Sequence, residues 1–132
     1  MDNAGLVKEL DKQAAKINKV QDVLIEVSIA GEAAKAGVSI GDAMQLVKEA
    51  AACRNIRVLG LMTMPPFSDD PEDSRPYFRS MRALAAGITE EHISSVSMQS
   101  LSMGMSGDFE VAIEEGATLV RVGTAIFGER HR

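Results

Sequence analysis

Residues 101–130 read LSMGMSGDFEVAIEEGATLVRVGTAIFGER, and this stretch decides the fold. It begins at the end of residues 93–101, where the spaced apolar residues Ile93, Val96, Met98 and Leu101 outline a strand. The spacing of the apolar residues then predicts a short helix over 109–113 that ends at Gly116, and a last strand over 119–122. A strand, a helix and a second strand in this order predict two parallel strands joined by a crossover.

The chain upstream of this stretch repeats the same alternation. Ser39 and Asp42 have the spacing of a capping box before one helix, and a later helix can begin after either Asp70 or Ser74. The strand that precedes this later helix ends before Pro65, because proline has no amide to donate to a sheet. A first helix is predicted over 3–19, and the two capped helices have their buried apolar residues within 43–51 and 77–88; the predicted strands lie over 23–29 and 56–62.

The order α-β-α-β-α-β-α-β predicts an α/β fold built from parallel strand-helix units. We expect a single domain over residues 1–132 with about four strands and four helices. Four such units make either a small open sheet or half of a TIM-type eightfold barrel, which needs about 250 residues when complete. Length alone does not choose between these two architectures.

The composition excludes several classes of protein. The 132 residues are 45% hydrophobic and 25% charged, which is typical of a globular domain. A net charge of −5 argues against binding to nucleic acid. No apolar run approaches the about 18 residues of a membrane helix, and the amino terminus lacks a signal-peptide pattern, so we expect a cytoplasmic protein. Cys53 has no disulfide partner, and His92 and His131 are too isolated to predict a metal site.

Ligands of parallel α/β folds bind at the carboxyl ends of the strands. Residues 102–108 follow one predicted strand and combine flexible glycines with the hydroxyl groups of Ser102 and Ser106. Gly123 and Thr124 follow the last strand, where glycine permits a close approach and threonine adds a donor. Free amides and hydroxyls at the starts of helices suit a phosphate group. The sequence therefore predicts a phosphate-binding site made by these two segments.

Several alternatives stay open at this point. Glycine and serine also form ordinary turns, and Arg121 could form a surface ion pair instead of reaching a ligand from its apolar strand. Lys35 is the only lysine close after a predicted strand, but its segment looks solvated and we do not expect a Schiff base there. Glu26 is expected to be paired within the structure rather than to act as a general base. Ser106 has no histidine that would complete a hydrolytic triad.

Four segments resemble the pyridoxal phosphate homeostasis protein family. They are residues 31–37 (GEAAKAG), 60–66 (GLMTMPP), 101–110 (LSMGMSGDFE) and 120–128 (VRVGTAIFG). They occur in the order and spacing of the family, and the resemblance covers essentially the whole chain. It implies an alanine-racemase-like TIM-type barrel that binds pyridoxal 5′-phosphate (PLP), has no established turnover of its own, and acts in vitamin B6 and amino-acid homeostasis.

The resemblance also implies roles for individual residues. Ser102, Gly123 and Thr124 would hold the phosphate, and Arg121 would lie near the cofactor. No catalytic and no metal-binding residue is expected. The expected cofactor-binding residues are Ser102, Met103, Gly104, Met105, Ser106, Arg121, Gly123 and Thr124, with Met103, Gly104 and Met105 shaping the phosphate loop.

The chain departs from the family in one large respect. The cofactor lysine of the family lies on its first strand, and strands one to four have no counterpart here. Ser28 also stands where the family commonly has asparagine. We therefore expect the C-terminal half of the barrel, present as a truncated product, an expressed fragment or a chain whose start codon is placed too late.

Three functional interpretations follow from a half barrel. In the first, a non-catalytic PLP carrier or regulator binds the phosphate without covalent attachment and self-associates through its exposed sheet edges. In the second, dimerisation completes the barrel of an amino-acid racemase-like PLP enzyme, with Lys35 or another lysine holding the cofactor. In the third, the half barrel folds but retains no ligand.

Overall fold

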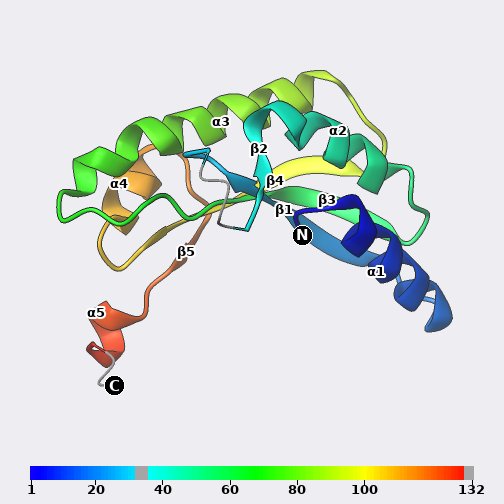
Figure 1. The fold of residues 1–132 in the computed structure, drawn as a ribbon, viewed down its shortest axis with the longest axis horizontal. Coiled ribbons are helices and arrows are strands. Elements are labelled where there is room, and N and C mark those ends of the chain that lie inside the picture. The colour runs from blue at the N-terminus through cyan, green and yellow to red at the C-terminus, as the bar shows by residue number, and fades with distance from the viewer. Residues whose placement is uncertain (32–35, 130–132) are drawn as a thin grey trace.

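The computed structural model describes residues 1–31 and 36–129, and it has a five-stranded parallel sheet with helices between the strands (Figure 1). The predicted α/β fold class is confirmed. No helix in these two ranges is long and apolar enough to cross a membrane. In chain order the elements are α1 (Ala4–Lys16), β1 (Gln21–Ser28), β2 (Val38–Ser39), α2 (Ile40–Ala51), β3 (Ile56–Met62), the 3-10 helix η1 (Pro71–Ser74), α3 (Arg75–Glu90), β4 (Val96–Met105), α4 (Phe109–Glu114), β5 (Leu119–Arg121) and α5 (Thr124–Phe127).

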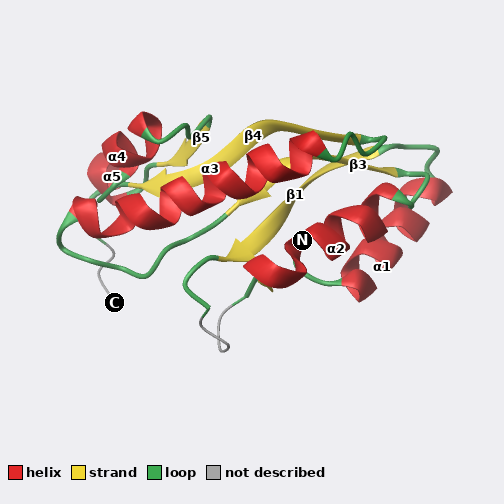
Figure 2. Ribbon diagram, turned by 90° about the horizontal axis from the view of Figure 1, so that it is seen from above, coloured by secondary structure: helices red, strands yellow, loops and turns green. Residues whose placement is uncertain are grey.

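One face of the sheet packs against the helices. The strands lie in the order β2-β1-β3-β4-β5, and every neighbouring pair is parallel. Ile25, Leu61 and Leu101 form a row across the three central strands, and all three side chains are buried. They belong to one apolar core with residues of α1, α2, α3 and α4. Figure 2 shows α2 and α3 along the same side of the sheet.

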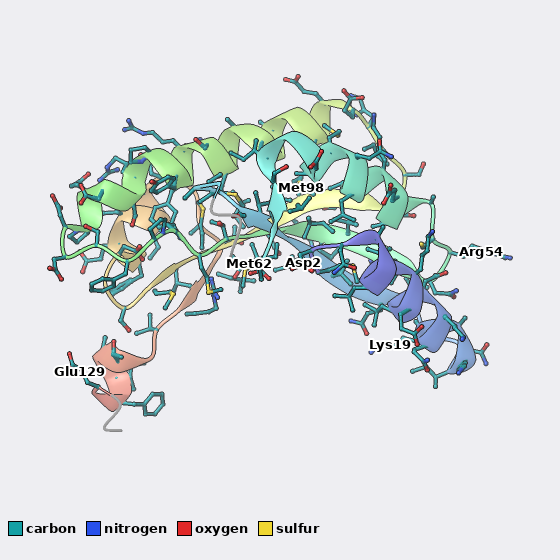
Figure 3. The ribbon with its side chains drawn as sticks, in the orientation of Figure 1. Asp2, Lys19, Arg54, Met62, Met98 and Glu129 are labelled. Carbon is teal, nitrogen blue, oxygen red and sulfur yellow. The ribbon has the colours of Figure 1, made fainter. Side chains whose placement is uncertain are left out.

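The rows on either side of this buried row point away from the core, because successive side chains of a strand face opposite ways. Most of their side chains are only half-buried, and Met62, labelled in Figure 3, is one of them. We call this side of the sheet the open face. Its two central rows are Leu24 with Gly60 and Ser100, and Glu26 with Met62 and Ser102.

Local chemistry explains where two helices begin. The amide of Asp42 donates to Ser39 Oγ at 3.2 Å, so Ser39 caps α2 as the predicted capping box requires. The Asp42 carboxylate accepts a 3.0 Å hydrogen bond from the Ser39 hydroxyl and not from the Ser39 amide, so the second bond of the box takes a different form. The ambiguous start near residue 70 contains two elements. Asp70 accepts a 3.0 Å hydrogen bond from the Glu72 amide and caps η1, whereas Ser74 makes no capping bond to α3.

β4 differs from the prediction at both ends. It starts at Val96 instead of Ile93, and it continues past Leu101 to Met105. The residues from Ser102 to Met105 therefore belong to a strand and do not form the predicted phosphate loop. β2 and α5, which have two and four residues, were not predicted, since neither is long enough to show a periodic pattern.

Close packing explains why small residues occupy the end of β4. Gly104 has a φ of 103°, and a Cβ atom at this position would lie 2.6 Å from the Cβ atom of Ala112 on α4. The register of β4 against β5 also shifts between Ser102 and Met105. The pattern of glycine and serine predicts a phosphate-binding loop, but at Gly104 the missing side chain lets a helix approach an irregular strand.

The first residue of the chain lies against β1. The amino group of Met1 donates to the carbonyl oxygen of Leu24 at 3.4 Å, and the amide of Glu26 donates to the carbonyl oxygen of Met1 at 2.8 Å. These two bonds flank Ile25, which is the pattern of a parallel bridge. Asp2 then accepts a 3.1 Å hydrogen bond from the Gly37 amide. The start of the chain is therefore hydrogen-bonded to β1.

Candidate functional site

The carboxyl ends of the parallel strands meet at one edge of the sheet, and the polar groups there come from segments far apart in the sequence. Ser106, in the turn after β4, is the centre of one group. Its Oγ atom accepts hydrogen bonds from the amides of Gly123 at 3.0 Å and Ala125 at 3.1 Å. The structure thus has a position where two backbone amides converge on one oxygen atom. We call these three residues the amide cradle.

The turn that carries Ser106 is fixed by its own hydrogen bonds. Asp108 accepts a 2.8 Å bond from the Met105 amide through its carboxylate, and the Asp108 amide donates to the Met105 carbonyl oxygen at 3.1 Å. This pair closes the turn between β4 and α4. The hydroxyl of Ser106 is therefore held at a defined place beside the start of α5.

Arg121 is the second polar feature of this edge. It lies on β5 in register with Met105, and its Nη2 atom donates to the carbonyl oxygen of Thr63 at 3.1 Å. The Nε atom of Arg121 is buried and has no hydrogen-bond partner among the described residues. A buried donor without a partner is costly, and such an atom points to an acceptor that belongs at this place.

Thr63 is a residue that the sequence analysis missed. It is fully buried, and its Oγ1 atom donates to the carbonyl oxygen of Val27 at 2.7 Å. Its position directly after β3 was a signal that could have identified it, because residues at strand ends carry the chemistry in such folds. Thr63 links the end of β1 to the guanidinium of Arg121.

The structure brings some of the predicted site residues together and separates others. Ser106 and Gly123 are bonded, and Thr124 is exposed at the start of α5 beside them. Ser102 lies four positions before Ser106 on β4 and is 6% exposed. The remaining predicted residues are Met103, which is buried in the core, Gly104, which contacts α4, and Met105 and Arg121, which form a register pair. The prediction for Lys35 falls outside the described residues.

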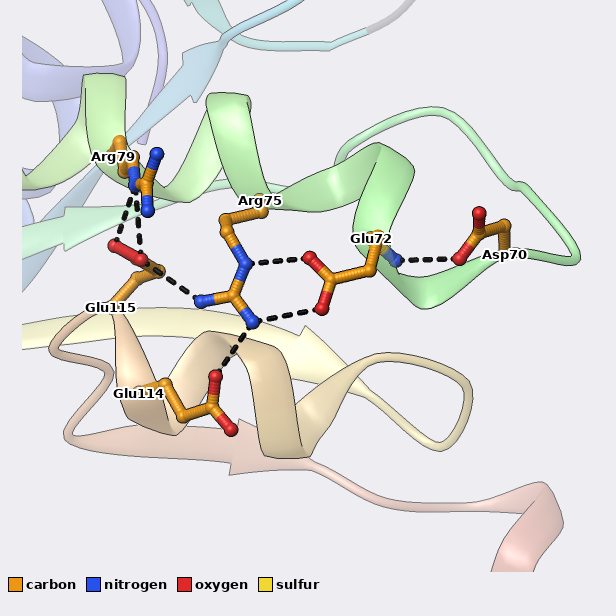
Figure 4. Close-up of polar contacts among 6 residues, drawn as sticks. All are labelled: Asp70, Glu72, Arg75, Arg79, Glu114 and Glu115. Atoms are coloured by element: carbon orange, nitrogen blue, oxygen red, sulfur yellow. Dashed lines mark hydrogen bonds and ion pairs between the residues drawn. The ribbon is translucent and has the colours of Figure 1, made fainter.

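A charged cluster supports the back of this site (Figure 4). Arg75, on α3, pairs with Glu72 at 2.6 Å, with Glu114 at 2.6 Å and with Glu115 at 3.0 Å, and Arg79 also reaches Glu115 at 3.0 Å. The hydrogen bond from Arg75, followed by that from Arg79, lowers the pKa of the largely buried Glu115 carboxylate below its usual value. The cluster fastens α4, and with it the turn at Ser106, to η1 and α3.

The chemistry of this edge fits an anionic oxygen ligand. Converging backbone amides, hydroxyl groups and a guanidinium are donors that phosphate groups use. Within residues 1–31 and 36–129 there is no group of three or more His, Cys, Asp or Glu residues that could hold a metal ion. The residues present therefore fit a phosphate held by donors of the protein itself.

Comparison with known proteins identifies the family to which this chain belongs. Residues 2–131 match the family model described as the alanine racemase N-terminal domain. The chain therefore belongs to the alanine racemase N-terminal domain family. More narrowly, it is 52% identical over 130 residues to the pyridoxal phosphate homeostasis protein of Aquifex aeolicus, an alignment that covers 98% of this chain and 56% of that protein. The resemblance predicted from the motifs is confirmed.

Solved structures agree with this assignment. A protein of unknown function from Bifidobacterium adolescentis has a TM-score of 0.90 at 34% identity, covering 96% of this chain and 51% of that one. PipY of Synechococcus elongatus, in a structure with PLP bound, has a TM-score of 0.85 at 27% identity, covering 97% of this chain and 58% of that one. The chain thus spans about half the length of the relatives it matches.

Proposed function

We propose that this chain binds pyridoxal 5′-phosphate through its phosphate group at the carboxyl edge of the sheet, as a non-catalytic carrier or regulator in vitamin B6 and amino-acid homeostasis in the cytoplasm. The residues that would hold the cofactor are Ser102, Met105, Ser106, Arg121, Gly123 and Thr124, whereas Met103 and Gly104, which pack against the helices, would support them from behind. The similarity to pyridoxal phosphate homeostasis proteins and to the PLP-bound PipY structure supports this choice of ligand.

The amide cradle is the observation that carries the proposal. The amides of Gly123 and Ala125 both donate to Ser106 Oγ, so their hydrogen atoms already point toward a single acceptor oxygen. A charged phosphate oxygen accepts stronger hydrogen bonds than a hydroxyl, so it can replace Ser106 Oγ as the partner of these amides. The Nε atom of Arg121, which has no partner among the described residues, supplies a further donor at the same edge. When bound, PLP supplies an aldehyde that reacts with amines, and the protein residues hold and orient it.

The described lysines support binding without covalent attachment. They lie on α1, in the turn after it or on α2, and all of them are exposed: Lys8, Lys12, Lys16, Lys19 and Lys48. None of them lines a cavity at the carboxyl edge. We therefore propose that the phosphate contributes most of the affinity of this chain for PLP.

A pair of ligands that differ only in the phosphate tests this function. PLP is expected to raise the melting temperature of the 132-residue chain in a concentration-dependent way, whereas pyridoxal, which lacks the phosphate, is expected to leave it unchanged. Inorganic phosphate should compete with PLP. Equal shifts with PLP and pyridoxal, or no shift with either, would refute phosphate-led binding. A borohydride-reducible attachment mapped to one lysine would refute the non-covalent part.

Self-association is a second proposal, and it rests on the sheet edges. The edge strand on one side of the sheet is β5, which has three residues, and the edge strand on the other side is β2, which has two. Leu119 of β5, which continues the row of Met62 and Ser102 on the open face, is 49% exposed. Unpaired edges beside apolar surface favour association. Light scattering should therefore give a mass above that of the monomer. A racemase assay on the associated form then distinguishes the carrier from a racemase-like enzyme whose barrel is completed by dimerisation.

A further inference from the structure

A cavity of about 390 Å³ opens between the segments that follow β1 and β3. Its volume lies in the range of small-molecule sites, and such sites combine apolar walls with a few polar groups. Among the described residues that line it, two are polar, Glu26 and Ser28. The apolar residues that line it are Val27, Ile29, Ala30, Ala36, Met64, Pro65, Pro66, Phe67 and Met105.

Glu26 is the charged group of this cavity. It lies on the open face in register with Met62, and its backbone is fixed because its amide donates to Met1 at 2.8 Å. The sequence analysis expected a partner for this carboxylate within the fold. In residues 1–31 and 36–129 the half-buried carboxylate makes neither a hydrogen bond nor an ion pair, so that expectation is not met there.

We propose that this cavity binds a small molecule that carries a protonated amine on an aliphatic body, with the amine at Glu26. A carboxylate inside apolar walls attracts an ammonium group strongly, since little water screens the pair. The methionine and proline side chains provide the contact surface for the aliphatic body. An anionic ligand is disfavoured by the same carboxylate.

The amine site is distinct from the amide cradle. None of Ser106, Gly123 and Ala125 lines the cavity, and the donors of the cradle suit anions, whereas Glu26 suits cations. Met105 lies between the two sites, since it lines the cavity and pairs in register with Arg121. The amine site therefore goes beyond the proposed PLP site and does not need it.

Three ligands of one shape test this inference on the intact chain labelled with ¹³C in its methionine methyl groups. n-Pentylamine, 1-pentanol and pentanoate share an aliphatic body and differ in charge. Pentylamine is expected to give saturable shifts at Met64 and Met105, with the core residue Met81 unchanged. Pentanol should bind at least about tenfold more weakly, because it lacks the charge. Pentanoate that binds as well as pentylamine, or a pentylamine that shifts neither methionine, would overturn the proposal.

Glu26→Gln removes the charge and preserves the shape of the side chain. It should weaken pentylamine binding at least about tenfold and leave pentanol binding unchanged. Glu49→Gln, on the exposed surface of α2, is the matched control and should change neither affinity. Unchanged pentylamine affinity in folded Glu26→Gln would contradict the assignment of Glu26. If this variant does not fold, the comparison of amine and alcohol on the unaltered chain still decides the outcome.

A phosphate titration of the same samples keeps the two proposals apart. Inorganic phosphate should shift the amide signals of Gly123 and Ala125 in both the unaltered chain and Glu26→Gln. An amine response without a phosphate response would retain the amine site and refute the cofactor site. A phosphate response without an amine response would do the reverse.

Discussion

Arg121 and Thr63, which are 58 residues apart, are joined by a 3.1 Å hydrogen bond from Nη2 of the arginine to the carbonyl oxygen of the threonine. The bond spans β4, which lies between β5 and β3 in the sheet. Thr63 in turn donates to Val27 at 2.7 Å, so one polar chain links the carboxyl ends of three strands. This chain fixes the guanidinium, while the Nε atom of Arg121 has no hydrogen-bond partner in the part of the chain that the structure describes.

Arg121→Lys is expected to weaken PLP binding about tenfold or more. A lysine has one flexible ammonium group and cannot keep the bond to Thr63 while presenting a second donor in a fixed direction. An absorbance titration with PLP measures the affinity. Arg57→Lys, in an exposed ion pair with Asp22, is the control and should bind normally. Equal affinities of the unaltered chain and Arg121→Lys would remove Arg121 from the site.

Thr63→Val is expected to lower the free energy of unfolding by about 1–3 kcal/mol, because it leaves the buried carbonyl oxygen of Val27 without its partner. Urea denaturation measures this change. Thr63→Ser keeps the hydroxyl and should lose less stability than the valine variant. If both variants are equally stable, the hydrogen bond to Val27 contributes nothing.

Ser106→Ala is expected to speed hydrogen exchange at the amides of Gly123 and Ala125 several-fold, since both amides lose their acceptor. Two-dimensional NMR in heavy water measures each amide separately. Ser94→Ala, at an exposed position away from this edge, should leave both rates unchanged. Unchanged exchange in Ser106→Ala would show that the cradle does not persist in solution.

Acid should destabilise the protein through the cluster around Arg75. The pKa of Glu115 is lowered in the folded state, first by its hydrogen bond with Arg75, and that of Glu72 is lowered by Arg75 as well. Such groups contribute stability above the ordinary carboxylate pKa of 4.5, and this contribution is lost as the pH falls through the lowered values. Glu115→Gln removes one of these carboxylates. Its melting temperature should therefore fall less than that of the unaltered chain between about pH 6 and about pH 3, the range in which carboxylates titrate. An unchanged pH profile would contradict this.

Gly104→Ala is expected to destabilise the fold by about 2 kcal/mol, since the added Cβ atom meets Ala112 and the residue has a positive φ. Adding Ala112→Gly should restore part of the loss, because it removes the contact between the two Cβ atoms. The unfavourable positive φ of residue 104 remains, so the recovery is partial. Urea denaturation of the single and double variants measures both effects. Full stability of Gly104→Ala alone would contradict the close packing of α4 on β4.

The spacing of apolar residues predicted the longer helices and strands, because the buried face of each element needs apolar residues at regular intervals along the chain. β3 has the predicted bounds, 56–62, and the capping box at Ser39 places the start of α2 correctly. The end of β4 could not be predicted in this way. Its glycine and serine residues have small side chains because α4 packs closely there, and a turn favours the same residues.

The candidate site was predicted in part. Ser106 and Gly123 come together as two strand ends imply, and both were identified from the residue types after those ends. The position of Thr63 directly after β3 was a signal, but its contacts with Val27 and Arg121 depend on the order of the strands, which is not encoded in local sequence. Glu26 has no side-chain partner among the described residues, and this likewise depends on its neighbours in space.

The hydrogen bonds that Met1 makes with Leu24 and Glu26 matter to anyone who attaches a tag or a dye to this chain. A fusion to the amino nitrogen alters a group that donates to Leu24 within the sheet. Glu129, at the other end of the described chain, lies beyond α5 and away from the core (Figure 3), and α5 itself begins beside the amide cradle. Labels for binding assays belong on the outer surface of α2 or α3, where neither edge is disturbed.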